Sequence, residues 1–253
     1  MHLILTGATG LVGSSVLDAM LKAKEVSKIS ILSRRPIKMA EDAHNPKVNV
    51  IIHNDFGRYE PAVLDQLKDA QGCVWALGIS QTKVSKEDYV KITKDYTLAA
   101  AESFASLPCS SPERPFRFVY VSGEGATQTP GRFSAIFARV KGETEQELAH
   151  LSDKYPTLQA DSVRPAFVDA AAHADILPYI PDPGLLYKAG LLVIAPPIRI
   201  GLPGSHSPTQ MLGSFLTQMA AGSSSIDLQA SGAARLGTSW VVPNVAMRRA
   251  MGM

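Results

Sequence analysis

The chain opens with MHLILTGATGLVG (residues 1–13), an apolar run that breaks into three glycines. We predict a strand over residues 1–6 and a helix over residues 14–23, joined by this glycine-containing turn. In a dinucleotide-binding turn, the first glycine permits the tight bend, the second lets the backbone approach a pyrophosphate, and the third lets the helix pack on the strand. The free N–H groups at the helix start then face the phosphates. We expect the turn to bind a cofactor through Gly7, Thr9, Gly10, Leu11, Val12 and Gly13.

The second predicted strand, residues 28–32, is followed by Ser33, Arg34, Arg35 and a proline. An NAD enzyme usually places a carboxylate here to accept a hydrogen bond from the ribose 2′-hydroxyl, whereas an NADP enzyme places arginine here. Two guanidinium groups and a hydroxyl suit a 2′-phosphate, because arginine binds phosphate through bidentate, charge-assisted hydrogen bonds. A solvated basic loop is the alternative. The position, about twenty residues after the glycines, favours NADP(H).

Bulk properties indicate a soluble, single-domain protein of 253 residues. The net charge of +2 does not suggest a nucleic acid or an anionic membrane as partner. Cys73 and Cys109 lie far apart, so we expect neither a disulfide scaffold nor structural zinc, and we predict a reducing, cytoplasmic location. No signal peptide is visible, and the longest apolar stretch, residues 189–198, contains two prolines and is too short to span a bilayer.

Apolar runs alternate with helical patterns along the first two thirds of the chain. This alternation predicts parallel βαβ units and one buried, doubly wound sheet of the Rossmann type. The further strands are predicted at residues 48–52, 73–77, 116–121 and 160–163, and the helices between them at 62–68, 86–107 and 133–150. We take residues 1–253 as one domain, with a nucleotide-binding core over 1–168 and a substrate-covering and C-terminal part over 169–253.

The pattern dissolves after Pro165. Residues 174–207 are rich in proline and glycine, so regular structure there is expected to be short. Ligands of such sheets bind beyond the carboxyl ends of the strands, so this segment should cover the pocket. One more helix is predicted over residues 207–221 and a short strand around residues 240–242.

Several segments of the core carry a family resemblance: GATGLVG (7–13), SRRP (33–36), WALG (75–78), DYT (95–97), VSG (121–123), VKGE (140–143) and VRP (163–165). With these motifs the chain resembles an atypical short-chain dehydrogenase/reductase, close to the HTATIP2-like (TIP30-like) and fungal NAD(P)-binding, epimerase-like proteins. The resemblance covers residues 1 to about 168. It implies NADP(H) binding, with Asp55 and Phe56 near the adenine. It further implies contacts along the cofactor from Ala76, Leu77 and Gly78, and on its nicotinamide side from Pro165, Ala166 and Phe167.

The catalytic motif of this family is incomplete in the chain. Family enzymes use a serine at the end of the fifth strand and Tyr-x-x-x-Lys on the next helix, where the lysine binds the nicotinamide ribose and lowers the tyrosine pKa. Ser122 and Lys141 match as catalytic residues, and Lys141 also as a cofactor ligand. The position four before Lys141 is Phe137, which has no proton to give.

Three functions remain open at this point. The first is an oxidoreductase for a small carbonyl or alcohol whose proton donor is Ser134, Tyr179, Tyr187 or a water held by Ser122. The second is an isomerase or cyclase that uses NADP(H) structurally. The third is a regulatory protein that binds NADP(H). Because the cofactor itself carries hydride chemistry, we favour the oxidoreductase.

The remaining polar residues suggest structural roles. We expect a small-molecule substrate and no metal, because His44, His53, His150 and His173 lack ligand spacing; we predict surface or loop roles for these histidines. We interpret the alternating acids Glu143, Glu145 and Glu147 as solvated helix surface, and we expect Arg132 and Asp169 to form ion pairs. Related enzymes pair through two long helices, so residues 86–107 and 133–150 are candidates for a homodimer interface.

Overall fold

The computed structural model describes residues 1–182 and 184–253. Its main element is an eight-stranded sheet in the order β3-β2-β1-β4-β5-β6-β10-β9, in which the only antiparallel pairing is between β10 and β9. The strands of this sheet are β1 (His2–Thr6), β2 (Lys28–Ser33), β3 (Val48–Ile52), β4 (Gly72–Trp75), β5 (Phe116–Val121), β6 (Leu158–Arg164), β9 (Ala234–Leu236) and β10 (Ser239–Pro243). The predicted doubly wound Rossmann-type architecture is confirmed.

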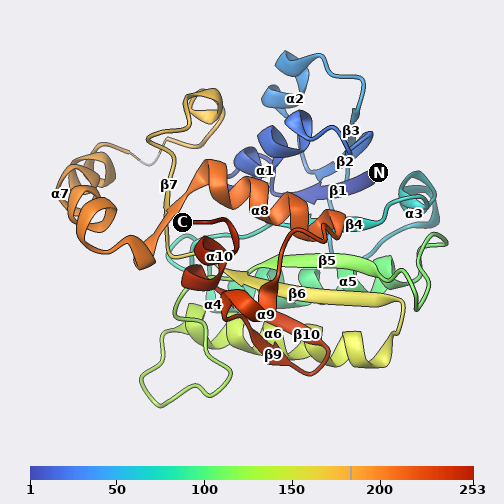
Figure 1. The fold of residues 1–253 in the computed structure, drawn as a ribbon. Coiled ribbons are helices and arrows are strands. Elements are labelled where there is room, and N and C mark those ends of the chain that lie inside the picture. The colour runs from blue at the N-terminus through green and yellow to red at the C-terminus, as the bar shows by residue number, and fades with distance from the viewer. Residues whose placement is uncertain (183) are drawn as a thin grey trace.

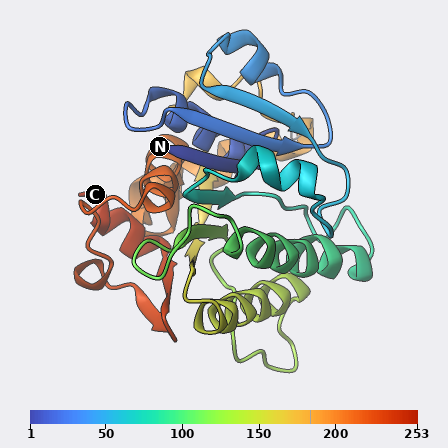
Figure 2. The ribbon, with the colours of Figure 1, turned by 90° about the vertical axis from the view of Figure 1, so that its right-hand side faces the viewer.

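Helices cover both faces of the sheet (Figures 1 and 2). The described helices are α1 (Leu11–Lys22), α2 (Lys38–Ala43), α3 (Pro61–Leu67), α4 (Lys86–Val90), the π-helix η1 (Lys91–Asp95), α5 (Tyr96–Ala105), α6 (Ile136–Lys154), the 3₁₀ turn η2 (Ala174–Ile176), α7 (Leu185–Gly201), the 3₁₀ turn η3 (Pro203–Ser205), α8 (Thr209–Ala221), α9 (Leu228–Ser231) and α10 (Asn244–Ala250). A separate two-stranded sheet joins β7 (Phe167–Asp169) to β8 (His206–Pro208).

Alternation along β1 divides the apolar core into two layers. Leu3 and Leu5 pack in one layer with side chains of α1 and α8, such as Phe215. Ile4 faces the other way and packs in a second layer with side chains of α5 and α6, such as Phe104. A strand buried on both faces is typical of a parallel sheet covered by crossover helices.

The segment after β7 differs from its prediction. Regular structure in residues 174–207 was expected to be short, yet α7 runs over 17 residues with Pro196 and Pro197 inside it. Each proline removes only one backbone donor, so the helix can continue through the hydrogen bonds of the turns on either side. Figure 1 shows α7 apart from the main sheet, on the side of η2 and β7. Among the described residues, no helix is both long and apolar enough to cross a membrane.

Candidate cofactor and active site

The three glycines of the turn between β1 and α1 have different roles. Gly7 has φ +71°, and a Cβ there would lie 2.2 Å from the carbonyl oxygen of Ala76. A Cβ at Gly13 would lie 2.0 Å from the carbonyl oxygen of Gly7, so α1 can approach β1 only with glycine at this position. A Cβ at Gly10 would meet only that same carbonyl oxygen, at 3.3 Å. Two glycines therefore serve packing, while Gly10 keeps the approach to the helix start open.

The start of α1 borders a cavity of about 510 Å³, which we call the central cavity. No side chain caps the helix at Gly10. The cavity is lined by residues 10–13, 76–80 and 122–124, and also by Thr93, Tyr120, Val121, Lys141, Pro165, Ala166 and Val168. These segments follow the carboxyl ends of β1, β4, β5 and β6, where the strand order reverses at β1 and β4 and where ligands of open α/β sheets bind.

A second cavity, of about 400 Å³, lies beside β2, and we call it the arginine cavity. Its walls are residues 7–9 and 32–35 together with Phe56 and Leu77, and Leu77 also lines the central cavity. Arg34 and Arg35 are exposed, and neither guanidinium has an ion-pair partner among the described residues. The two adjoining cavities, the open Gly10 and the uncapped helix start fit an extended dinucleotide whose adenosine end lies at the arginines.

Three of the predicted cofactor contacts, Ser33, Asp55 and Phe167, either bond within the protein or lie outside both cavities. The hydroxyl of Ser33 lies at the arginine cavity but donates to the Arg35 carbonyl oxygen at 2.8 Å, so it also shapes the loop. Asp55 is exposed, accepts a hydrogen bond from the Gly57 N–H at 3.0 Å, and lines neither cavity. Phe167 stacks on His206, and Val168 lines the central cavity in its place.

Ser122 directly follows β5, and its hydroxyl donates a hydrogen bond within the protein. The residue is 2% exposed, and its Oγ donates to Glu145 Oε1 at 2.6 Å. The proton of Ser122 therefore points to a carboxylate rather than to a ligand.

Glu145 corrects the interpretation of the acidic run as solvated surface. Its side chain is fully buried, and both oxygens are satisfied. Oε1 accepts from Ser122 and from Arg164 Nε at 2.8 Å, and Oε2 accepts from Gln128 Nε2 at 2.7 Å and from Arg164 Nη2. The hydrogen bonds from Arg164 raise the pKa of that guanidinium. Glu143 and Glu147, on other faces of α6, are partly exposed as predicted.

Lys141 lies one helical turn before Glu145, on the wall of the central cavity. Its Nζ donates to the carbonyl oxygen of Val121 at 3.4 Å and to that of Ser122. Burial lowers the pKa of Lys141 to about 8, against the opposing effect of the Glu145 carboxylate. A Cβ at Gly123 would lie 3.5 Å from Nζ, so position 123 faces the ammonium group without a side chain.

The predicted proton donors do not gather at this cavity. Phe137 is half-buried, and its ring packs near Gly125 rather than on the cavity wall. Ser134 Oγ accepts a hydrogen bond from the Gly131 N–H at 2.9 Å. Tyr179 lies near Asp42, whose hydrogen bond raises the tyrosine pKa. The side chain of Tyr187 lies outside the described residues.

The ion-pair predictions are half right. Asp169 accepts from Arg199 Nε at 2.6 Å and lies 3.0 Å from His206 Nε2, which confirms its structural pairing. Arg132 is exposed and has no ion-pair partner among the described residues, so that prediction is wrong.

Two of the four histidines, His53 and His173, are buried, whereas surface or loop positions were predicted. His53 is buried and stacks on Tyr59, and His173 is 1% exposed, with its ring nitrogens 3.0 Å from Asp18 and from Thr209. Asp18, His173 and Asp175 lie close enough together to hold a metal ion. The Lys22 ammonium already bridges the two carboxylates, at 2.8 Å and 2.7 Å, so it supplies the positive charge there.

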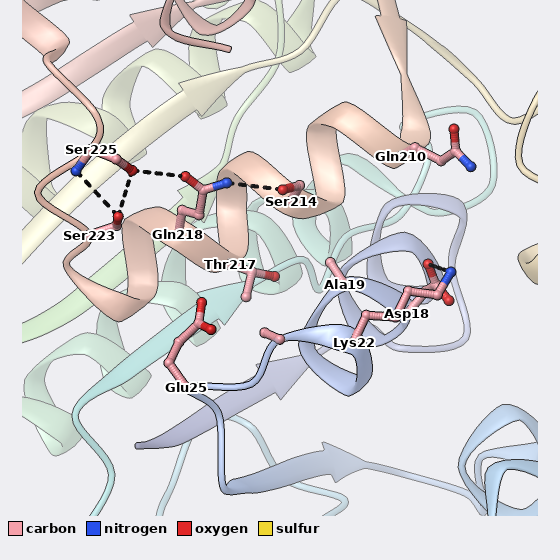
Figure 3. A pocket seen from close by; sticks show the side chains of 11 residues that line it. Asp18, Ala19, Lys22, Glu25, Gln210, Ser214, Thr217, Gln218, Ser223 and Ser225 are labelled. Atoms are coloured by element: carbon pink, nitrogen blue, oxygen red, sulfur yellow. Dashed lines mark hydrogen bonds and ion pairs between the residues drawn. The ribbon is translucent and has the colours of Figure 1, made fainter.

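A separate groove of about 560 Å³ lies between α1 and α8 (Figure 3). Asp18 and Lys22 lie on one side of it, and Gln210, Ser214 and Gln218 on the other. It shares no lining residue with the central cavity.

No family model matches the chain. Leucinostatins biosynthesis cluster protein T from Purpureocillium lilacinum is 35% identical over 238 residues, which are 87% of this chain and 84% of the relative. Botcinic acid biosynthesis cluster B protein 16 from Botryotinia fuckeliana is 44% identical over 138 residues, 54% of this chain and 87% of the relative. Protein HTATIP2 from Rattus norvegicus is 29% identical over 147 residues, 57% of this chain and 55% of the relative.

Solved structures share the fold at low sequence identity. A short-chain dehydrogenase/reductase from Saccharomyces cerevisiae superposes with a TM-score of 0.63 at 14% identity, over 96% of both chains. The Bordetella bronchiseptica enzyme WbmF in complex with NAD+ gives a TM-score of 0.61 at 15% identity, over 87% of this chain and 69% of the other. The chain has the Rossmann-type fold of the short-chain dehydrogenases/reductases and belongs to the same family as leucinostatins biosynthesis cluster protein T, with HTATIP2 as a more distant relative.

Proposed function

We propose that the protein binds NADP(H) and catalyses hydride transfer to or from a small carbonyl or alcohol. The observation that carries the choice of NADP(H) is the pair of unpartnered guanidinium groups, Arg34 and Arg35, on the arginine cavity. No carboxylate lines this cavity to accept a hydrogen bond from a ribose 2′-hydroxyl. A 2′-phosphate would give both guanidinium groups an anionic partner.

The residues of the central cavity fit the other end of the cofactor. The backbone N–H groups at the start of α1 would bind the pyrophosphate, and Lys141 would hold the nicotinamide ribose. Pro165 and Ala166 would form the wall beside the nicotinamide, which supplies the hydride chemistry when bound. A cytoplasmic location and a homodimer remain predictions.

Titration of NADPH and NADH, followed by nucleotide fluorescence, tests the cofactor choice. We expect NADPH to bind more tightly, and Arg34→Ala or Arg35→Ala to weaken NADPH binding while leaving NADH unchanged. A charge-assisted bond to phosphate contributes about 1.5–3 kcal/mol, or a factor of roughly 10–150 in Kd. Arg132→Ala is the matched control, because this arginine is also exposed and unpaired but lies outside both cavities. Equal affinities for the two nucleotides would refute the assignment.

A second candidate is a non-redox isomerase or cyclase, or a regulatory protein, that binds NADP(H) without consuming it. The observation in its favour is that Phe137 has no hydroxyl and the Ser122 hydroxyl already donates to Glu145. Following the absorbance of NADPH across a panel of carbonyl compounds separates the two candidates. Steady oxidation supports hydride transfer, whereas product formation at constant NADPH supports the non-redox function.

A further inference from the structure

The proton that a carbonyl oxygen needs on reduction cannot come from the usual hydroxyls in this cavity. Phe137 lacks the phenol and does not line the wall. Gly123, which faces Lys141, has no side chain, and Ser122 donates its proton to Glu145. Because the Ser122 hydroxyl donates its only proton to Glu145, its oxygen can accept a hydrogen bond from a ligand but cannot donate one.

Lys141 remains as a donor on the same wall. Two of its three N–H groups are used by the carbonyl oxygens of Val121 and Ser122, so one is left over. Because position 123 carries no side chain, the space in front of Nζ is not filled from β5. The lowered pKa, about 8, brings the ammonium group near the range in which proton exchange at neutral pH is efficient.

The other ionisable groups around Nζ are less suited to this role. Tyr120 on β5 also lines the cavity, but its hydroxyl is fully buried, and burial raises its pKa far above neutral. Glu145 on α6 is held by Arg164 at the end of β6 through two hydrogen bonds. Glu124, in the loop after β5, is exposed at the rim. The π-helix η1 contributes Thr93, which does not titrate near neutral pH.

We propose that Lys141 Nζ, and not a phenol, exchanges the proton with a ligand oxygen in the central cavity, with Ser122 and Glu145 as positioning residues. This inference rests on the proposed oxidoreductase function. In reduction, an N–H bond of Lys141 breaks as the O–H bond of the product alcohol forms, and the neutral amine regains a proton from water. In oxidation the neutral amine accepts the proton of the alcohol.

The protonation of Lys141 can be measured without any substrate. The whole protein is pulsed with acetic anhydride between about pH 6 and 10.5, a span around the ordinary lysine pKa of about 10.4, and each lysine is quantified by peptide mass spectrometry. We expect Lys141 to react with a midpoint near 8, well below the ordinary lysine value of about 10.4 that a lysine model peptide gives in the same pulse. A midpoint for Lys141 that equals that of the model peptide, or no reaction at any pH, would overturn the proposal. This result stands even if the protein turns out not to consume NADPH, so the two failures are distinguishable.

Two variants separate positive charge from proton exchange. Lys141→Arg keeps a cation near the ribose but cannot give up its proton, whereas Lys141→Met keeps neither. The Kd of the Lys141→Arg variant for NADPH should stay within a few-fold of that of the unchanged protein. Its turnover of phenanthrenequinone, a carbonyl compound, should fall by a factor of roughly 10²–10⁴. The pH–rate profile should also lose its limb near pH 8. Full turnover by Lys141→Arg would assign the lysine to ribose binding alone and refute the proposal.

Discussion

Replacing Glu145 tests whether the buried network under the site is as interdependent as its geometry indicates. Glu145→Ala removes the acceptor of Ser122, Gln128 and Arg164 at once. The side chain of Arg164 is only 18% exposed, so the variant leaves a largely desolvated cation without its partner.

The expected loss of stability follows from that burial. Breaking a buried ion pair by removing one partner costs about 3–5 kcal/mol, because the remaining charge is uncompensated. For a chain of this size, each kcal/mol lowers Tm by about 2–4 °C, so Glu145→Ala should lower it by roughly 6–20 °C. Glu145→Gln keeps one acceptor oxygen and should cost less.

Glu143→Ala is the matched control, two residues away on the same helix. Its carboxylate is 40% exposed and lies 3.6 Å from Lys94, so this surface pair should contribute only about 0–1 kcal/mol. Thermal and urea unfolding of both variants measure the difference. Equal losses for the two alanine variants would refute the assignment of a buried network. Replacing Glu145 and Arg164 together with apolar residues should recover part of the loss.

Three further outcomes are expected. Gly10→Val should abolish NADPH binding in a titration while the protein stays folded by circular dichroism, whereas Gly13→Ala should destabilise the fold itself because its Cβ would lie 2.0 Å from a carbonyl oxygen. Phe137→Tyr should preserve or raise NADPH turnover with carbonyl substrates, and NADPH that binds to both proteins without being consumed by either would count against hydride transfer. Burial alone would raise the pKa of Asp169, but hydrogen bonds, chiefly from Arg199, lower it to about 2. The stabilisation of the folded state by Asp169 is therefore full above the unfolded pKa of about 3.9 and is lost as the pH falls towards 2. Asp169→Asn should make the loss of stability with falling pH less steep. It should also make α7 more sensitive to protease at neutral pH.

The fold was predictable where local pattern and tertiary environment agree. Apolar runs with one polar residue each predicted residues 48–52 and 116–121 as strands, and the structure has Val48–Ile52 and Phe116–Val121. The pattern failed for α2, which is short, with polar and apolar residues in equal number at Lys38–Ala43. It also failed for α7, where prolines argue for breaks but the helix continues. Helix propensity reflects only local sequence preference, whereas the secondary structure of these two segments is set by their tertiary contacts.

The sequence predicted which positions line the candidate site, but it did not predict the hydrogen-bond partners of their side chains. Position after a predicted strand identified Gly10 and Arg34, and the resemblance to the family's Tyr-x-x-x-Lys motif identified Lys141. Spacing did not reveal the hydrogen-bond partner of Ser122, because Glu145 lies 23 residues further along the chain. One signal was available: Glu145 is four residues after Lys141, so the two share a helix face.

The direction of the Ser122 proton changes what the motif means. A serine after the fifth strand donates to a substrate oxygen only if no other group accepts its proton, and here the Glu145 carboxylate accepts it at 2.6 Å. Arg164 also donates to that carboxylate, so the donor is lost through Glu145, a residue that does not line the central cavity. Phe137 and Gly123 also lack hydroxyls, so the proton exchange that we propose for the central cavity would use Lys141, whose pKa is lowered to about 8 by burial. The atypical character of this site therefore follows from the residues around the motif as much as from the missing tyrosine.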